Sequence, residues 1–324
     1  MLALKPVSVY SLHMSLRGQI KAACATHQGQ RRDHNEDYVR CWEPETEADE
    51  SQHGWVYIVA DGVGGADAGE VASQYATEQA LIHYFKDKET HDWGRRLVNA
   101  MQAANTDLRQ LVAVRNHNRR MATTMVAVVI QNDRAFMANV GDSRGYRWRD
   151  GQLKQITKDQ SLVAKLLEEG AITAEEAENH PRKNVILSSV GSEKRAQIDL
   201  FQITFQPQDI LVLCSDGLTR HVSDAEISEI IAKEPPETAV NTLVDLANER
   251  GGEDNISVTI VQYDKEKPKE TAVSPATNTQ TRSTPIMAAT GTSDTSVPFL
   301  RQYTIMLTFL ETALIFYFWY ILRP

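Results

Sequence analysis

The chain is poor in cysteine and has no cluster of basic residues. Its 324 residues include only three cysteines, which are widely spaced and form no Cys-x-x-Cys pair. This pattern predicts neither a disulfide framework nor a zinc site, and it favours a reducing cytoplasm. The formal net charge is -9 and no run of Lys and Arg is present. We therefore expect no nucleic-acid partner, because phosphate backbones are bound through a basic surface.

The N-terminus lacks the features of a secretion signal, and the chain lacks internal repeats. Residues 1–16 carry a broken apolar stretch with no small-residue cleavage site after it, so we expect no signal peptide. No repeat occurs at the periods of solenoid proteins. Hydrophobic residues make up 42% of the chain. That content is enough for one large core or two modest ones.

Composition divides the chain into three parts. Residues 19–263 are dense in strand and helix patterns and form the predicted catalytic domain. Residues 264–298 are rich in Lys, Glu, Thr, Ser and Pro, a composition that predicts a disordered linker. Residues 299–324 are strongly apolar. The sequence thus predicts a globular domain, a linker and a hydrophobic C-terminal helix.

Two β-hairpins are predicted within the domain. The apolar runs 123–130 and 135–140 flank a short polar turn and predict the first hairpin. Residues 145–148 and 153–156 flank Asp150-Gly151, a pair that favours tight turns because both positions tolerate positive φ. Antiparallel hairpins of this kind indicate that one sheet packs on another.

Helix patterns are grouped around these hairpins rather than alternating with single strands. Residues 69–85 carry a stripe of alanines at helical spacing, and residues 97–111 carry larger apolar residues at the same spacing. Ser223 and Glu226 form a capping box at the start of a third helix. Grouped helices and antiparallel hairpins together predict an α+β layered domain.

Acidic residues stand at the ends of apolar runs. Asp61 and Asp216 follow the runs 55–60 and 210–214, which are typical of strands buried on both faces. A carboxylate at the end of a buried strand needs a hydrogen bond, an ion pair or a bound cation, because burying it alone is costly. Several such ends, meeting in space, would form an oxygen-lined site suited to Mg²⁺, Mn²⁺ or Ca²⁺.

Each acidic motif also has a simpler interpretation. An Asp-Gly pair is most often a turn, and we interpret Asp150-Gly151 as one because no buried run precedes it. Three further motifs fit a hairpin corner, a strand entry and a solvated charge cluster, respectively: Gly141-Asp142, Asp254-Asn255 and Glu36-Asp37. No single motif therefore identifies the site.

Taken in order, the motifs resemble those of the metal-dependent Ser/Thr protein phosphatases of the protein phosphatase 2C superfamily, in their bacterial form. They are Arg32-x-x-Asn35-Glu36-Asp37, Asp61-Gly62-x-Gly64-Gly65, Thr123-Thr124 before an apolar strand, Gly141-Asp142-Ser143-Arg144, Ser215-Asp216-Gly217-Leu218 and Asp254-Asn255. The resemblance covers residues 19–263. It implies a central antiparallel β-sandwich flanked by helices in α-β-β-α layers, with two Mg²⁺ or Mn²⁺ ions at one end.

The resemblance implies a set of metal ligands. Asp61 would bridge both ions, with the carbonyl of Gly62 as a further ligand. Glu36 would hold one ion, and Asp216 with Asp254 would hold the other. A weaker third site would be formed by Asp216 together with Asp142.

The remaining roles implied by the resemblance concern water and substrate. Asp37 would orient metal-bound water, Arg32 would bind the substrate phosphate, and Asn255 would support the site without touching a metal. Two divalent cations offset the charge of a phosphate monoester dianion and lower the pKa of a water towards about 7. The implied function is therefore hydrolysis of phosphoserine and phosphothreonine on proteins by a metal-activated water, opposing a Ser/Thr kinase. The alternatives are a catalytically impaired phosphoprotein-binding module and a small phosphoester hydrolase.

Three positions near the site depart from the family pattern, one of which is Ala122 in place of the usual Gly before Thr123-Thr124. Val63 stands where some members have a His that protonates the leaving alkoxide. That proton must come from elsewhere, either from water near Asp142 or from His34. Gln160 stands where a His is expected, and we expect it to retune the flap at residues 158–191.

The apolar C-terminal segment predicts a membrane anchor. As a helix, residues 303–322 would span about 30 Å, enough to cross a bilayer. Tyr317-Phe-Trp-Tyr320 suits a membrane interface, whereas Glu311 is unfavourable in lipid unless a partner helix shelters it. We expect a cytoplasmic catalytic domain anchored to the inner face of the cell membrane. An interfacial or protein-docking helix is the alternative.

Overall fold

The computed structural model describes residues 8–14, 19–64, 68–115 and 121–264, all of which lie in one compact unit. Their helices and strands, in chain order, are β1 (Ser8–Met14), β2 (Ile20–His27), β3 (Asp37–Trp42), α1 (Glu47–His53), β4 (Trp55–Val63), α2 (Ala68–Lys86), α3 (Trp93–Arg115), β5 (Ala122–Thr123), β6 (Met125–Gln131), β7 (Arg134–Val140), β8 (Arg144–Arg149), β9 (Gln152–Gln155), α4 (Leu162–Glu168), α5 (Ala174–Glu178), β10 (Asp199–Thr204), β11 (Ile210–Cys214), α6 (Asp216–Thr219), α7 (Asp224–Lys233), α8 (Pro236–Glu249) and β12 (Ile256–Tyr263). Strand β1 pairs with β2, so the first sheet begins before the predicted domain start at residue 19.

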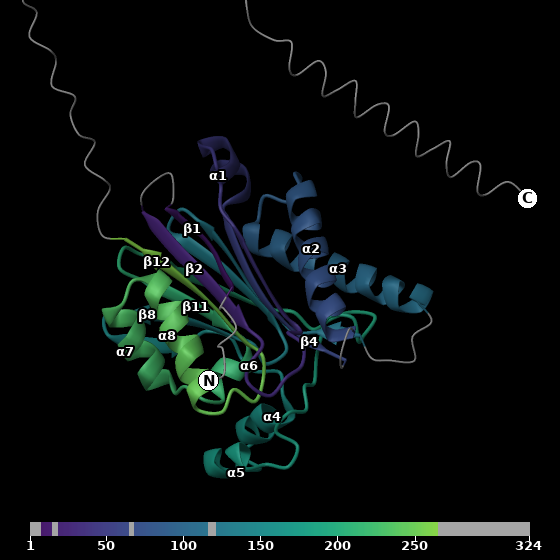
Figure 1. Cartoon of the computed structure of the whole chain (residues 1–324). Coiled ribbons are helices and arrows are strands. Elements are labelled where there is room, and N and C mark those ends of the chain that lie inside the picture. The colour runs from purple at the N-terminus through teal and green to yellow at the C-terminus, as the bar shows by residue number, and fades with distance from the viewer. Residues whose placement is uncertain (1–7, 15–18, 65–67, 116–120, 265–324) are drawn as a thin grey trace, which may run out of the picture. The chain divides into compact units, whose positions relative to one another are not determined.

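The strands form two antiparallel sheets. One sheet has the order β1-β2-β12-β11-β8-β9, and the other has the order β10-β7-β6-β4-β3, with the short β5 pairing with β4. Helices α2 and α3 cover the outer face of the second sheet, and α7 and α8 cover the outer face of the first (Figure 1). The α+β fold with two antiparallel sheets and flanking helices is therefore confirmed.

Residue alternation along β4 shows how the layers are built. Trp55, Tyr57 and Val59 pack between the two sheets. The intervening Val56 and Ile58 pack under α2 and α3. Because successive side chains of a strand point to opposite faces, a continuous apolar run supplies both cores at once. The prediction that residues 55–60 form a strand buried on both faces is confirmed.

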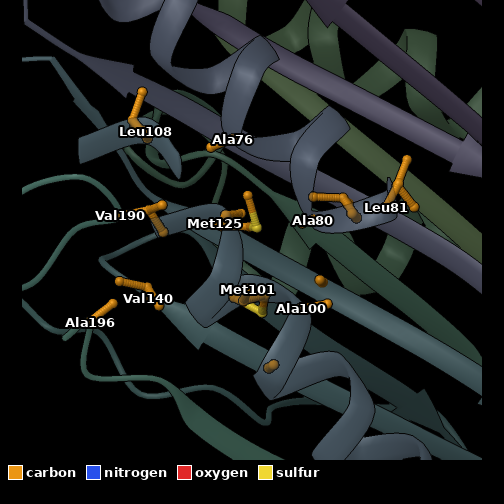
Figure 2. Packing of buried hydrophobic residues seen from close by; sticks show 14 of the residues in the cluster. Ala76, Ala80, Leu81, Ala100, Met101, Leu108, Met125, Val140, Val190 and Ala196 are labelled. Atoms are coloured by element: carbon orange, nitrogen blue, oxygen red, sulfur yellow. The ribbon is translucent and has the colours of Figure 1, made fainter. Parts of the chain in front are cut away.

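Small residues bring α2 close to its sheet. The predicted alanine stripe is fully buried at Ala72 and Ala76, and Ala80 is almost so. In the same cluster, Met101 of α3 lies near Met125 of β6, and their flexible side chains fill the space between helix and sheet (Figure 2). The helix itself spans Ala68–Lys86, close to the predicted 69–85.

The predicted turn and helix cap are both present. Asp150 and Gly151 have φ values of 51° and 79° and join β8 to β9, which confirms that Asp150 is a turn residue. The Ser223 side chain accepts a hydrogen bond from the backbone N–H of Glu226, and the Glu226 side chain accepts one from the Ser223 N–H. Local sequence rules therefore describe these two sites well.

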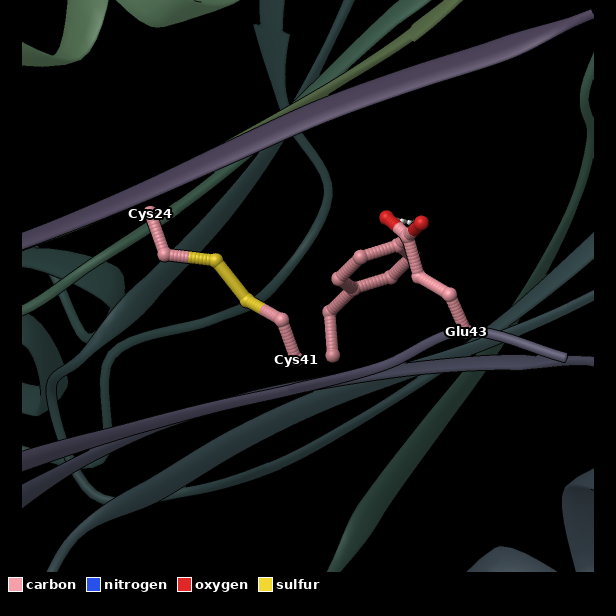
Figure 3. The surroundings of a disulfide bond; sticks show 4 residues. Cys24, Cys41 and Glu43 are labelled. Carbon is pink, nitrogen blue, oxygen red and sulfur yellow. Dashed lines mark hydrogen bonds between the residues drawn. A yellow bond between two sulfur atoms is a disulfide. The ribbon is translucent and has the colours of Figure 1, made fainter. Parts of the chain in front are cut away.

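The absence of a disulfide was a wrong prediction. Cys24 of β2 and Cys41 of β3 are joined by a disulfide that links the two sheets, with Cα atoms 7.2 Å apart (Figure 3). The two cysteines are 17 residues apart in the sequence. They meet because β2 belongs to one sheet and β3 to the other, and the two sheets pack face to face. Cys214 is free and buried.

The predicted C-terminal helix, residues 299–324, lies outside the described residues, as does the predicted linker after Asp264. Among the helices that the structure does describe, none is both long enough and apolar enough to cross a membrane.

Candidate active site

Strand direction brings the predicted carboxylates to one end of the sandwich. Asp61 lies near the end of β4, and its Cα pairs with that of Asp37 at the start of the antiparallel β3. Asp142 follows β7, Asp216 follows β11, and Asp254 precedes β12. Because neighbouring strands run in opposite directions, the ends of β4, β7 and β11 and the starts of β3 and β12 meet at the same edge.

The backbone of Asp61 is held by two threonines. Its N–H donates to Thr124 Oγ1 at 3.1 Å. Its carbonyl accepts from Thr123 Oγ1 and from the Thr124 N–H, each at 2.8 Å. The Thr-Thr motif therefore positions the residue predicted to lie at the centre of the metal site.

Glu36 is positioned by backbone and amide contacts. Its N–H donates to Asn255 Oδ1 at 2.8 Å, and its carbonyl accepts from the Gly62 N–H at 3.0 Å. A Cβ at Gly62 would collide with the backbone of Gly69 and of Glu36, and a Cβ at Gly69 would collide with the Glu36 carboxylate. Glycine is therefore required for the close approach of α2 to this carboxylate. Burial raises the pKa of Glu36, and Arg32 opposes that shift.

Ser215 has a role that the sequence did not reveal. Its place after an apolar run indicates only buried strand packing, but its Oγ donates to Asp37 Oδ2 at 2.8 Å and accepts from the Ser257 N–H at 3.0 Å. A hydroxyl directly before Asp216, a predicted metal ligand in the Ser-Asp-Gly motif, was the available signal. Burial raises the pKa of Asp37 to about 7, and the nearby Asp216 and Asp254 contribute to that rise.

Burial and neighbouring carboxylates both act on Asp61. Burial raises the pKa of its carboxyl well above the usual range, and four other carboxylates add to the shift: Asp37, Asp216, Asp142 and Asp254. Burial, followed by Asp216 and Asp159, raises the pKa of Asp142 to about 7. Like charges gathered in a partly buried space favour either protonation or a bound cation.

The donor set fits divalent cations that prefer oxygen. Within the described part of the chain, three buried carboxylate oxygens have no hydrogen-bond partner: Asp37 Oδ1, Asp142 Oδ1 and Asp216 Oδ1. Unpaired buried carboxylate oxygens are costly, and Mg²⁺ and Mn²⁺ prefer such hard ligands. In the same described ranges, no three His, Cys, Asp or Glu side chains are placed so that together they could hold a metal ion, and the fit rests on the chemistry of the donor atoms and their gathering at one end of the sandwich. The residues fit the ions by chemistry and by location.

Two arginines supply the cations that touch the cluster. Arg32 Nη2 lies 2.8 Å from Asp254 Oδ1 and 2.9 Å from Asp254 Oδ2. Arg220, which sequence reasoning did not single out, pairs with Asp216, and its Nη1 lies 3.5 Å from Asp254 Oδ2. The predicted phosphate-binding Arg32 is therefore at the rim of the cluster, with 47% of its side chain exposed.

The flap carries α4 and α5 and is attached beside the site. Gln160 is buried, its Oε1 accepts from the Gly141 N–H at 3.0 Å, and its Nε2 donates to Asp199 Oδ2 at 2.8 Å. Thr123 forms an isolated β-bridge with Val190 at the other end of the flap. The Gln160 side chain, which stands where the family has a His, therefore anchors the base of the flap to the loop that carries Asp142.

Comparison with known proteins identifies relatives over most of the chain. The protein phosphatase 2C family profile matches residues 26–252. The chain is 38% identical over 247 residues to the serine/threonine phosphatase stp of Listeria monocytogenes, covering 74% of this chain and 94% of the relative. It is 34% identical over 244 residues to the protein phosphatase PhpP of Streptococcus pneumoniae, covering 74% and 95%, respectively.

Solved structures agree with these sequence relatives. The serine/threonine phosphatase Stp1 from Staphylococcus aureus superimposes with a TM-score of 0.69 at 34% identity, covering 78% of this chain and 99% of that one. The catalytic domain of PstP, solved in complex with two manganese ions, superimposes with a TM-score of 0.65 at 32% identity, covering 76% and 99%. The chain therefore belongs to the protein phosphatase 2C family and is a metal-dependent protein-serine/threonine phosphatase.

Proposed function

We propose that the acidic cluster at the end of the sandwich is a binuclear Mn²⁺ or Mg²⁺ centre and that Asp61 is the ligand shared by both ions. The observation that carries this proposal is the position of Asp61 near the end of β4, where its Cα pairs with that of Asp37 and the neighbouring aspartates help to raise the pKa of its carboxyl. A related catalytic domain, that of PstP, binds two manganese ions. A central carboxylate among many is the position expected of a bridging ligand.

Each side of the centre has its own ligands in this proposal. Glu36 and the Gly62 carbonyl would hold one ion, and Asp216 with Asp254 would hold the other. Asp142 combines with Asp216 at a weaker third position, consistent with its unpaired buried oxygen. When bound, the ions offset the charge of the phosphate dianion and supply an activated water nucleophile.

The protein's own side chains orient the reactants. Asp37, held by the Ser215 hydroxyl, orients the attacking water. Arg32 presents a planar fork of donors that can bind two phosphate oxygens and stabilise their charge during transfer. Its exposed position at the rim allows a phosphoprotein side chain to reach it.

The ligand assignment is tested by Asp61→Asn in the full chain, with Asp150→Asn as the matched control. Asp150 belongs to an Asp-Gly pair of the same kind but lies at the β8–β9 turn. With Mn²⁺ and a phosphothreonine peptide, Asp61→Asn should lower kcat/KM by about 100-fold or more, whereas the control should match the wild type. Mn²⁺ stoichiometry by calorimetry should fall for Asp61→Asn only.

Other results would change the assignment. Wild-type turnover by Asp61→Asn at saturating Mn²⁺ would remove Asp61 from the centre. Turnover of p-nitrophenyl phosphate by the wild type, without turnover of the peptide, would instead indicate a hydrolase of small phosphoesters.

We further propose that the enzyme opposes a protein Ser/Thr kinase and works at the cytoplasmic face of a membrane. The phosphoester that it hydrolyses must be made by such a kinase. Residues 303–322 are long and apolar enough to cross a bilayer as a helix. The polar stretch 264–298 would act as a flexible linker with an r.m.s. reach of roughly 30 Å, so substrates near the membrane would be favoured.

A further inference from the structure

We propose that Arg220 is an internal counter-cation of the metal centre, which holds one oxygen of Asp216 and lies beside one of Asp254 in the metal-free protein and thereby weakens the binding of an ion there. The proposal rests on the proposed function, because it takes these two aspartates as ligands. Beyond the proposed function, it assigns to Arg220 the role of lowering the affinity for the ion at Asp216 and Asp254, without affecting the ion at Glu36.

The position of Arg220 follows from local structure. Helix α6 starts at Asp216, directly after β11, and Arg220 lies at its C-terminal end, where the Arg220 N–H donates to the Asp216 carbonyl at 2.9 Å. Residues four apart on a helix lie on the same face. The guanidinium therefore folds back over the Asp216 carboxylate, and its Nη2 bonds Asp216 Oδ2.

The same guanidinium reaches a second predicted ligand. Arg220 Nη1 lies 3.5 Å from Asp254 Oδ2, and Arg32 bonds Asp254 from another side. The two aspartate side chains are only 16% and 14% exposed, and that of Arg220 is 29% exposed. Two arginines thus face two carboxylates, and their charges balance without a metal ion. Ion pairs this well shielded are screened much less than surface pairs.

Metal binding and this ion pair compete for Asp216 Oδ2 and Asp254 Oδ2, the two oxygens that Arg220 approaches. A lone pair on Asp216 Oδ2 cannot serve an arginine donor and a metal ion together, and the positive guanidinium repels a second cation nearby. In the described cluster, Asp37, Asp142 and Asp216 each keep one oxygen without a partner, so at Asp216 the guanidinium occupies Oδ2 alone. The ion at Asp216 and Asp254 should therefore bind more weakly than the ion at Glu36.

The test measures Mn²⁺ binding to the EDTA-stripped full chain by calorimetry, together with thermal unfolding in EDTA. Arg220→Gln should tighten the weaker of the two main sites by about tenfold, because charge-assisted hydrogen bonds no longer have to be broken. The same variant should unfold at a lower temperature in EDTA. Arg220→Lys keeps the positive charge but loses the forked guanidinium donors. Its Mn²⁺ affinity and its unfolding temperature in EDTA should therefore lie between those of the wild type and of Arg220→Gln.

The control is Arg149→Gln. It removes an Arg–Asp pair of the same type, in which Arg149 Nε lies 2.6 Å from Asp209 Oδ1 at the opposite end of β11. It should lower stability and leave Mn²⁺ affinity unchanged. Unchanged or weaker Mn²⁺ binding by both Arg220→Gln and Arg220→Lys would overturn the proposal.

Asp216→Asn separates this proposal from the ligand assignment. If Asp216→Asn binds Mn²⁺ like the wild type, the ligand assignment itself fails. If Asp216→Asn loses affinity but Arg220→Gln gains none, only the role of Arg220 is refuted.

Discussion

Single residues at the site are held firmly but left electrostatically unsatisfied. Threonine hydroxyls fix the backbone of Asp61, and Ser215 fixes one oxygen of Asp37. Their carboxyl groups nevertheless repel one another and have raised pKa values. Residues arranged in this way stabilise a bound cation and destabilise the metal-free fold, as expected where function requires strain.

These raised pKa values predict a stability that depends on pH in the absence of metal. Asp37 has an ordinary pKa of 3.8 and a folded pKa of about 7, so the folded state binds its proton more tightly than the unfolded state. The resulting stabilisation is complete below the ordinary value and is lost as pH rises towards 7. Within this window, each pH unit changes the free energy of unfolding by about 1.4 kcal/mol per carboxyl.

Denaturant unfolding in EDTA near pH 5.5 and pH 8 measures this effect. The wild type should be less stable near pH 8, and Asp37→Asn should reduce the difference by about 2 kcal/mol because the titrating group is gone. An Asp37→Asn protein with the same pH dependence as the wild type would falsify the assignment of this pKa.

At the scale of elements, one connection carries much of the site. The chain between β2 and β3 holds Arg32 and Glu36, and the Cys24–Cys41 disulfide closes this segment at the level of the two strands. A cross-link restricts the conformations that the unfolded chain can adopt and so stabilises the folded state. It also restrains the base of the loop that presents these two residues.

Reduction of the disulfide should lower stability and change the thiol count. Under denaturing conditions, the protein purified without reductant should show one reactive thiol, Cys214, and the reduced protein should show all three cysteines. The free energy of unfolding should fall by about 3 kcal/mol or less on reduction. The lower part of that range is expected because a Cα separation of 7.2 Å is wider than usual for a disulfide.

Cys41→Ser provides the control for this measurement. It should lack any dependence of stability on reductant. Three reactive thiols in the unreduced wild type would show that the bond does not form in the protein as produced.

At the scale of the whole molecule, the fold separates stability from chemistry. Three apolar layers lie under α2 and α3, between the sheets, and under α7 and α8. The carboxylates gather at one end of the sandwich, where loops and strand ends can vary without opening these layers. The proposed C-terminal anchor would determine where in the cell this catalytic unit works.

The anchor is tested by cell fractionation. The full chain should sediment with membranes, and a variant that ends at residue 298 should be released while retaining its rate on a phosphothreonine peptide. Leu314→Arg keeps the length of the tail but places a charge near its middle, and it should shift the protein towards the soluble fraction. An unchanged membrane fraction for the truncated variant would contradict the proposal.

Sequence patterns predicted the local features that depend on neighbours in the chain. The turn at Asp150-Gly151, the cap at Ser223 and the doubly buried strand 55–60 follow from local rules and periodicity, and the structure has all three. The family resemblance rested on the order of short motifs, which is also a property of the sequence alone. Fold class and enzyme class could therefore be predicted from the sequence.

Tertiary structure decided which distant groups meet. The contact of Cys24 with Cys41, the bond from Ser215 to Asp37 and the reach of Arg220 to Asp254 all join residues from different elements. Such pairings depend on how strands are ordered in two sheets and on the packing between them, and no local pattern encodes that order. By itself the sequence thus determined the elements and the chemistry of the motifs, while the fold determined which charges must be balanced against each other.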